Sequence, residues 1–503
     1  MSTGSSSTAP STFFSGNDAD VRLRRLAARL GMEAEATADP ELRVLPLGAD
    51  FPLNLERCLV HLPPPGRPAS EVLTWLRARP ETRDQITLVV AADPAAQEAL
   101  HRQAASDLAT LQVVPSGAEL TELLLSPEPL RVLARVITSQ VRRTRVSPYQ
   151  TGGGVNRDAV FFGRDDLLAD VLNRKPANYL VVGGRQLGKS SLLKAIRRRL
   201  ADDPRVDTRY LVLSGGDLAG SLAHSLGLVR DAGLDAVLEH LGQSERRILF
   251  LIDEADALVR EHRRALGGTE EGDDRPGETE EDLFRRLLSL SEEGRCHFIL
   301  AGFWDLYEAV ALDYRSPLRN FGETLRIGAL EEDACVALAT VPMAGMGLGY
   351  EAGALVEHLV ERTGRRANLI AITCDEILKN LDAATRTIRA ADVDAALASW
   401  AIHDALDGWK YLAGEDESRL DRIVVYATIE GDAFTLAEVL ETLARHGSEI
   451  AADRVERSLK RLELAWVVGS DGDAFRYRVP LFVDRVRGQD PASLLRTELK
   501  KLV

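Results

Sequence analysis

The sequence has few cysteines and no long apolar run. Its cysteines are Cys58, Cys296, Cys335 and Cys374, and they form neither a CxxC pair nor a spacing typical of a zinc site. Free buried thiols fit a reducing compartment. No apolar run reaches the roughly 18 residues that a membrane-spanning helix needs. These absences argue against a disulfide-stapled secreted protein and against a helical membrane protein.

The first twenty residues also lack the features of a targeting signal. They contain no lysine, no arginine and no apolar core segment, so they do not resemble a secretory signal peptide. We expect residues 1–20 to form a disordered tail and the protein to be cytoplasmic, with no membrane partner.

The sequence also lacks an excess of basic over acidic residues. The chain has 62 Lys and Arg against 77 Asp and Glu, a net charge of −15. This balance excludes a bulk nucleic-acid coat, although a locally basic module could still bind DNA. With 503 residues, of which 45% are hydrophobic, the chain is long enough for about three or four domains with sizeable cores.

The first region, residues 21–141, alternates short apolar runs with amphipathic stretches. Residues 57–62, 86–92 and 111–115 are expected strands, and residues 70–79, 94–104 and 129–141 are expected helices. Such alternation predicts an α/β domain with a parallel sheet, of receiver or flavodoxin type. No strand ends in an acceptor aspartate, so we expect an interaction domain that docks a protein partner. Residues 142–158, rich in glycine and charge, are the expected linker.

The next region carries the clearest chemical motif. An apolar strand at 178–182 leads into a glycine-rich loop, and a helix follows at 192–200. This is GxxxxGK[ST] between a strand and a helix, the context that a phosphate-binding loop requires. The loop amides and the helix N-terminus attract phosphate, the lysine reaches the β- and γ-phosphates, and the first serine hydroxyl can bind Mg²⁺. The residues are Gly183, Gly184, Arg185, Gln186, Leu187, Gly188, Lys189, Ser190 and Ser191.

A second apolar strand, residues 248–252, ends at two adjacent acids. Asp253 is the expected Mg²⁺-side carboxylate, and Glu254 is the expected base that polarises the attacking water. Another strand follows at 296–301. The polar residue nearest its end is Asp305, several residues beyond it, so we assign no γ-phosphate sensor.

Arg319 lies in a turn before the last expected strand, residues 323–330. It could reach a γ-phosphate, either in its own chain or in a neighbouring copy. The alternative is an ordinary surface arginine.

The segment 267–282 carries eight acids and one arginine. Such a run cannot bury itself. We predict that it is a disordered loop and that limited proteolysis cuts there first.

The C-terminal third is expected to be helical at 331–410 and to form a helix-and-hairpin unit at 416–487, followed by a tail at 488–503. Three helices and a hairpin predict a winged helix. Residues 419–487 contain 11 bases and 12 acids, whereas a DNA-binding domain normally has a basic surface. Protein docking is therefore slightly favoured over DNA binding.

Taken together, these motifs resemble the STAND and Cdc6/Orc-like branch of the AAA+ P-loop ATPases, over residues 159–487. In that family a hydrophobic-Gly-Arg element packs near the adenine, and Phe162, Gly163 and Arg164 match it. A Gly-x-Pro sensor is common in the family's helical lid. The matching stretch here, residues 363–368, lacks the proline, and Arg365 or Arg366 could substitute for it.

The resemblance implies an ASCE-type ATPase domain at 159–330, a lid at 331–410 and a winged helix at 416–487. It also implies binding of ATP with Mg²⁺, slow hydrolysis and the role of a signal-transduction switch. Its partners would be a protein and further copies of the chain in a nucleotide-dependent homo-oligomer. One alternative is an Orc/Cdc6-like DNA-binding initiator or loader. Another is a scaffold that binds ATP without turnover, against which the intact Lys189, Asp253 and Glu254 argue.

Overall fold

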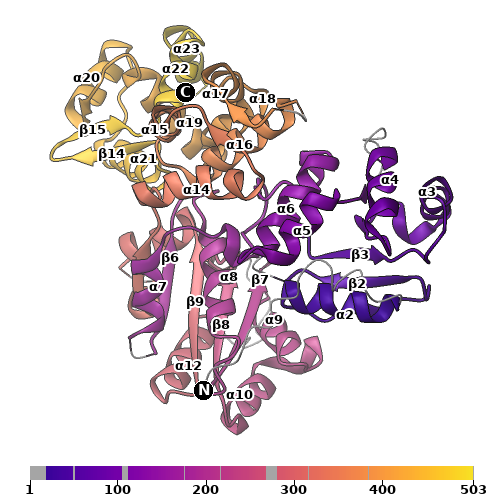
Figure 1. The fold of residues 1–503 in the computed structure, drawn as a ribbon. Coiled ribbons are helices and arrows are strands. Elements are labelled where there is room, and N and C mark those ends of the chain that lie inside the picture. The colour runs from indigo at the N-terminus through magenta and orange to yellow at the C-terminus, as the bar shows by residue number, and fades with distance from the viewer. Residues whose placement is uncertain are drawn as a thin grey trace.

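The computed structural model describes residues 18–48, 51–104, 111–174, 176–213, 215, 217–267, 280–314, 316–382 and 385–501. The predicted tail up to residue 17, and most of the predicted acidic loop, lie outside the described residues. Figure 1 shows an N-terminal α/β module beside a central sheet, with the helical lid and the C-terminal unit packed above that sheet. Over the described ranges no helix combines the length and the apolar character needed to cross a membrane.

The N-terminal module is a five-stranded sheet with helices on both faces. Its strands lie in the order β1-β2-β3-β4-β5, with β3, β4 and β5 parallel and β1, β2 and β3 antiparallel. The elements are α2 (Ala19–Leu30), β1 (Glu35–Ala36), β2 (Leu42–Pro46), β3 (Arg57–His61), α3 (Ala69–Ala78), β4 (Thr87–Val89), α4 (Pro94–Ala104), β5 (Gln112–Val113), α5 (Gly117–Leu125) and α6 (Pro129–Gln140).

Two expectations for this module need correction. The sheet is mixed and sequentially ordered, whereas a flavodoxin-like sheet is parallel in the order 2-1-3-4-5. The cause is β2, which the sequence did not reveal: the connection from β2 to β3 is too short for a crossover, so the two strands pair antiparallel. The expected tail of residues 1–20 also ends too late, because the Asp18 side chain caps α2 and the helix begins at Ala19.

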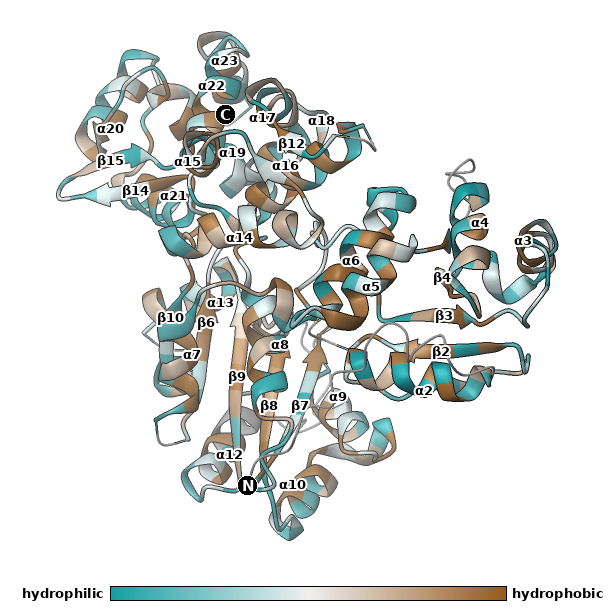
Figure 2. Ribbon diagram, in the orientation of Figure 1, coloured by the Kyte–Doolittle hydropathy of each residue, from teal (hydrophilic) through white to brown (hydrophobic). Residues whose placement is uncertain are grey.

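The central domain is built on a parallel sheet in the order β10-β6-β9-β8-β7. Figure 2 shows its inner strands as strongly hydrophobic. Strand β9 lies between β6, which leads into the phosphate loop, and β8, which ends at Asp253, as the ASCE-type expectation requires. The elements are α7 (Asp165–Leu172), β6 (Tyr179–Val182), α8 (Lys189–Arg199), β7 (Val206–Val212), α9 (Leu218–Ser225), α10 (Gly233–Gln243), β8 (Arg247–Asp253), α11 (Asp256–Gly267), α12 (Glu280–Glu292), β9 (Cys296–Gly302), α13 (Trp304–Tyr307), the 3₁₀ turn η6 (Pro317–Asn320) and β10 (Glu323–Arg326).

Helices dominate the remainder of the chain. The lid region contains α14 (Glu332–Gly345), β11 (Gly349–Tyr350), α15 (Gly353–Arg362), α16 (Ala367–Asn380), β12 (Thr387–Ile388), α17 (Ala390–Leu397), α18 (Trp400–Asp407) and the 3₁₀ turn η7 (Gly408–Tyr411). The C-terminal unit contains α19 (Glu415–Thr428), β13 (Phe434–Thr435), α20 (Leu436–Arg445), α21 (Ala452–Leu464), β14 (Val468–Asp471), β15 (Ala474–Tyr477), α22 (Pro480–Arg487) and α23 (Pro491–Lys500). Its small sheet is antiparallel, in the order β13-β15-β14.

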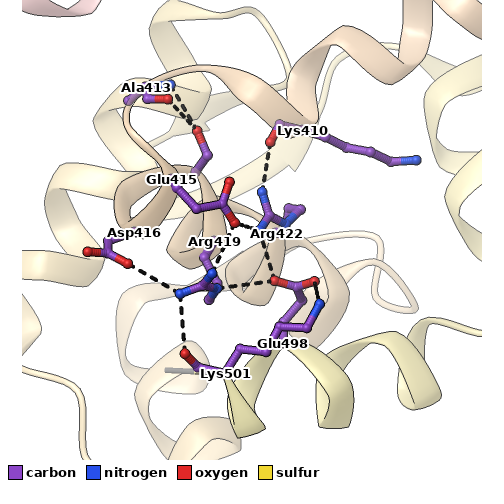
Figure 3. A network of polar contacts seen from close by, with 9 residues as sticks. Lys410, Ala413, Glu415, Asp416, Arg419, Arg422, Glu498 and Lys501 are labelled. Atoms are coloured by element: carbon purple, nitrogen blue, oxygen red, sulfur yellow. Dashed lines mark hydrogen bonds and ion pairs between the residues drawn. The ribbon is translucent and has the colours of Figure 1, made fainter. Parts of the chain in front are cut away.

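The expected C-terminal tail at 488–503 is also corrected. Residues 491–500 form α23, whose N-terminus the Asp490 side chain caps. Leu495 is buried, and Glu498 pairs with Arg419 and Arg422 of α19 (Figure 3). The segment is therefore part of the C-terminal unit.

The hydrophobic cores do not follow the expected domain limits. One core joins the N-terminal module to the lid, for example Leu26 and Ile137 with Leu338 and Ile370. Another joins the central sheet to the C-terminal unit, for example Phe250 with Leu459. The lid contributes to both cores, because Leu369, Ile372 and Ile402 belong to the second one. It therefore packs on the N-terminal module as well as on the central sheet and the C-terminal unit.

Candidate nucleotide-binding site

The phosphate loop leaves β6 at Val182 and enters α8 at Lys189. Gly188 has φ +101°, a backbone conformation that a side chain would strain. The Lys189 ammonium donates to the carbonyls of Gly183 (2.8 Å) and Gly184 (2.9 Å). Desolvation lowers the pKa of Lys189, while the carboxylates of Asp256, Asp253 and Glu254 oppose that shift. The lysine is thus held within the loop, next to the acids of β8.

The two acids at the end of β8 occupy different environments. Asp253 is buried, and its carboxylate accepts from the Tyr210 hydroxyl (2.9 Å) and from the Glu254 amide (3.0 Å). Burial raises the pKa of Tyr210, and the charge of Asp253 adds to that shift. Glu254 has φ +59° and an exposed side chain that lines the cavity described below. The turn therefore fixes Asp253 and leaves Glu254 accessible, which suits a metal-side acid followed by a base.

The other acids nearby have structural partners. Asp256 accepts from the amides of Phe303 (2.6 Å) and Leu306 (3.0 Å) and so holds the end of β9. Asp305 pairs with Arg260 at 3.0 Å. Neither arrangement identifies a γ-phosphate sensor.

Phe162 and Arg164 both line the cavity, Phe162 through apolar packing and Arg164 through hydrogen bonds. Phe162 packs against the core shared by the N-terminal module and the lid. The Arg164 guanidinium is buried, and its pKa is lowered by that burial. It donates to the carbonyls of Gly328 (2.7 Å), Ala329 (2.8 Å) and Leu187 (3.2 Å). Arg164 therefore ties the phosphate loop to the segment after β10.

These side chains surround a cavity of about 890 Å³. Of the predicted residues it is lined by Phe162, Arg164, Arg185, Gln186, Leu187, Gly188, Lys189, Ser190, Ser191 and Glu254. Four predicted residues lie within two positions of lining residues in the sequence but do not line the cavity themselves: Gly163, Gly183, Gly184 and Asp253. Its size suits a ligand of nucleotide dimensions, because small-molecule pockets usually measure about 300–1,000 Å³.

Two predicted arginines lie elsewhere. Arg319 belongs to η6, just before β10, and its guanidinium stacks on the Tyr314 ring at 3.6 Å. Because β10 runs parallel to β6, the start of β10 lies at the end of the sheet opposite the phosphate loop. Arg319 therefore does not reach the cavity of its own chain. Arg365 is exposed and outside the lining, whereas Arg366 donates to the Arg185 carbonyl at 3.4 Å. Burial lowers the pKa of Arg366 to about 10.

Sequence reasoning missed two walls of the cavity. One is the expected linker, whose residues 148–155 line it. The Val155 amide donates to the Ser191 hydroxyl (3.0 Å), and Lys194 donates to the Gly154 carbonyl (3.0 Å). The glycine-rich run 152–154 was the only available signal. The other wall, residues 412–414 and Glu417, comes from the start of the C-terminal unit, and no motif marks it.

The C-terminal unit also contacts the phosphate loop directly. The Gly184 amide donates to the carbonyl of Leu464, the last residue of α21, at 2.8 Å. A Cβ at Gly184 would lie 2.8 Å from Ala465 Cα, so only glycine allows this approach. The Trp466 indole donates to the Gly364 carbonyl at 3.2 Å. The end of α21 is therefore docked on the loop and on the lid.

No curated protein matches the sequence. Among solved structures, a Walker-type ATPase of Pyrococcus abyssi, PABY2304, is 18% identical over 66% of this chain and 98% of its own, with a TM-score of 0.47.

Two further structures are similar over comparable lengths. The ORC1 protein of Aeropyrum pernix, solved with DNA, is 15% identical over 67% of this chain and 96% of its own, with a TM-score of 0.34. The RuvB Holliday junction branch migration motor of Thermotoga maritima is 16% identical over 65% and 96%, with a TM-score of 0.35. Since each of these TM-scores is below 0.5, the likenesses bear on no functional conclusion.

The family comparison is more specific. Residues 154–389 match the family described as Novel STAND NTPase 1, nSTAND1. The matched region contains the phosphate loop, both acids of β8 and most of the lid. The resemblance to STAND NTPases expected from the sequence is confirmed over residues 154–389, which match this family.

Proposed function

We propose that the protein is a Mg²⁺-dependent ATP-binding switch that hydrolyses ATP slowly and signals through the position of its C-terminal unit. The observation that carries this proposal is the hydrogen bond from Gly184 to Leu464. It makes the phosphate loop a docking surface for α21 as well as a nucleotide-binding element. A ligand that rearranges the loop must therefore change the docking free energy of the C-terminal unit.

The donor set fits Mg²⁺. The Ser190 hydroxyl and the Asp253 carboxylate are oxygen ligands, and Mg²⁺ in nucleotide sites is held by one or two such groups together with phosphate and water. When bound, the ion would neutralise phosphate charge. Lys189 would bind the β- and γ-phosphates, and Glu254 would accept the proton of the attacking water.

The shared core gives the N-terminal module a route to the nucleotide. Because this module shares a hydrophobic core with the lid, a protein partner bound to it would act on the lid wall of the cavity. The linker strengthens the connection, since Ser147 donates to the buried Asp375 of the lid at 2.7 Å. We propose that this module senses or docks the partner.

Arg319 fits a role in assembly. Arg319 does not reach the cavity of its own chain, but at its end of the sheet it could contact the ATP bound to a neighbouring copy. Such a contact would make ATP favour a homo-oligomer. We expect Glu254→Gln with ATP to sediment as larger particles than with ADP. In a chain that keeps Glu254, Arg319→Ala should lower the rate of ATP turnover without changing the affinity for nucleotide.

The DNA-binding alternative gains no support from the docked arrangement. On α21, the third helix of the predicted winged helix, the bases are Arg454, Arg457, Lys460 and Arg461. Arg461 is buried in an ion pair with Asp421 at 2.7 Å, and Arg457 pairs with Glu308 of the central domain. Lys460 pairs with Glu456 at 2.6 Å, so three of these four bases are engaged within the chain. Undocking of the helix would free only Arg457, because the pairs of Lys460 and Arg461 lie within the C-terminal unit.

Substitution of Gly184 tests whether the contact between the phosphate loop and α21 holds the C-terminal unit in place. Gly184→Ala puts a Cβ against the Ala465 backbone, and overpacking of this kind costs about 1–3 kcal/mol. We expect deuterium uptake in residues 451–468 to rise while the fold of the central domain is retained.

The matched control is Gly242→Ala, where nothing lies within 4 Å of an added Cβ. Unchanged uptake after Gly184→Ala would show that α21 does not dock on the loop.

A further inference from the structure

The start of α19 brings a carboxylate into the nucleotide cavity. Glu417 lines the cavity together with Glu254 and Trp304, and its side chain is 46% exposed. Glu417 belongs to the C-terminal unit, whereas Glu254 and Trp304 belong to the central domain. A charged side chain of the docked unit thus faces the same space as the catalytic end of the site.

This carboxylate is only partly neutralised. The Arg461 guanidinium makes two bonds to the carboxylate of the buried Asp421, both at 2.7 Å, and one longer bond to the Glu417 carboxylate at 3.3 Å. It also donates to the Glu417 backbone carbonyl at 3.0 Å. One guanidinium therefore serves two carboxylates, and the three groups together carry one net negative charge. Arg461 also lies over the Trp304 ring at 4.8 Å, so this cluster stands at the wall between the C-terminal unit and the cavity.

The rest of the helix start is rigidly held. Figure 3 shows Arg422 bonded to Glu415, to Glu498 and to the Lys410 carbonyl, each at 2.9 Å. Ser418 closes the turn by accepting from the Ala413 amide at 3.0 Å. These contacts fix the first turn of α19, so the backbone of Glu417 stays at the cavity wall as long as the C-terminal unit does not move.

We propose that Glu417 is a nucleotide-discriminating residue, whose charge makes the docked arrangement favour a diphosphate over a triphosphate. This inference rests on the proposed function. A γ-phosphate adds negative charge to a cavity that already holds this carboxylate, and like charges close together repel. The repulsion is relieved when the C-terminal unit undocks, so ATP would separate α21 from the phosphate loop and ADP would not.

Calorimetry with Mg²⁺ tests the proposal, using ADP and a non-hydrolysable ATP analogue. Glu417→Gln keeps the shape of the side chain and removes its charge. We expect the ratio of the analogue Kd to the ADP Kd to fall about fivefold. That factor corresponds to ~1 kcal/mol, the size of one charge–charge interaction over about 4 Å in water.

Two further variants separate charge from packing. Asp416→Asn removes a charge from the same helix turn, but Asp416 is 87% exposed and pairs with Arg419, outside the cavity lining. Glu417→Asp keeps the charge and shortens the side chain. Both variants should retain the wild-type ratio. The amides at the start of α19, which attract phosphate, are common to every variant and cancel in the comparison.

The outcomes are distinct. An unchanged ratio in Glu417→Gln, or an equal fall in Asp416→Asn, overturns the role of Glu417 while leaving the switch intact. A fall in Glu417→Asp as large as in Glu417→Gln also overturns it, because packing would then explain the effect. A wild-type protein that binds neither nucleotide contradicts the proposed function itself.

Discussion

Glu254→Gln should abolish most ATP turnover and leave ATP binding intact. Glutamine keeps the size and hydrogen-bonding capacity of glutamate but cannot accept a proton. The lost general-base assistance is worth roughly 10²–10⁴-fold in rate. Binding should survive because Lys189, Ser190 and the loop amides are unchanged. Phosphate release and calorimetry on the same preparation measure the two effects separately.

The structure also predicts that this variant folds. Glu254 is exposed, and its amide makes the bond to Asp253, which the substitution leaves in place. Glu261→Gln, an exposed acid on the following helix, is the matched control and should turn over ATP like the wild type. Normal turnover in Glu254→Gln would remove Glu254 from the mechanism.

Lys189→Ala should remove most nucleotide affinity. Without ligand, the ammonium is paired with the carbonyls of Gly183 and Gly184, so its role in folding is limited to two exchangeable bonds. With ligand, its partners would be phosphates. Truncating one side of a desolvated charged pair costs about 2–5 kcal/mol, so we expect at least a ~30-fold rise in Kd for ATP and ADP.

Calorimetry measures the affinities, and thermal unfolding without nucleotide checks the fold. Arg199→Ala, an exposed cation on the same helix, should bind normally. Full affinity in Lys189→Ala would contradict the phosphate-loop assignment, because the lysine is the cation that reaches the β- and γ-phosphates in that motif.

The sequence predicted the parts of the site that are local in the chain. The spacing from Gly183 to Ser191 and the acids at 253 and 254 follow directly from strand, loop and helix patterns, and residues 185–191 and Glu254 line one cavity. Glu417 was not predictable in this way. It is distant in sequence from the loop and reaches the cavity through packing of α19 and α21, which no local pattern encodes.

The same reason explains the errors in the fold. Strand β2 contains Arg43 and ends on Pro46, and a proline argues against a strand inside a sheet. The strand was therefore missed, and the direction of the N-terminal sheet could not be derived. Helix α23 was taken for a tail because its burial depends on contact with α19. The two composite cores were hidden for the same reason, since they join segments that are far apart in the chain.

The central claim is that nucleotide state sets the docking of the C-terminal unit, and a distance between two spin labels tests it most directly. Labels at Gly242→Cys on α10 and His446→Cys after α20 report on the central domain and the C-terminal unit. The native cysteines are all buried, so labelling should be selective. In the Glu254→Gln background we predict one narrow distance distribution with ADP and a shifted or broadened one with ATP. The same narrow distribution with both nucleotides would contradict the account.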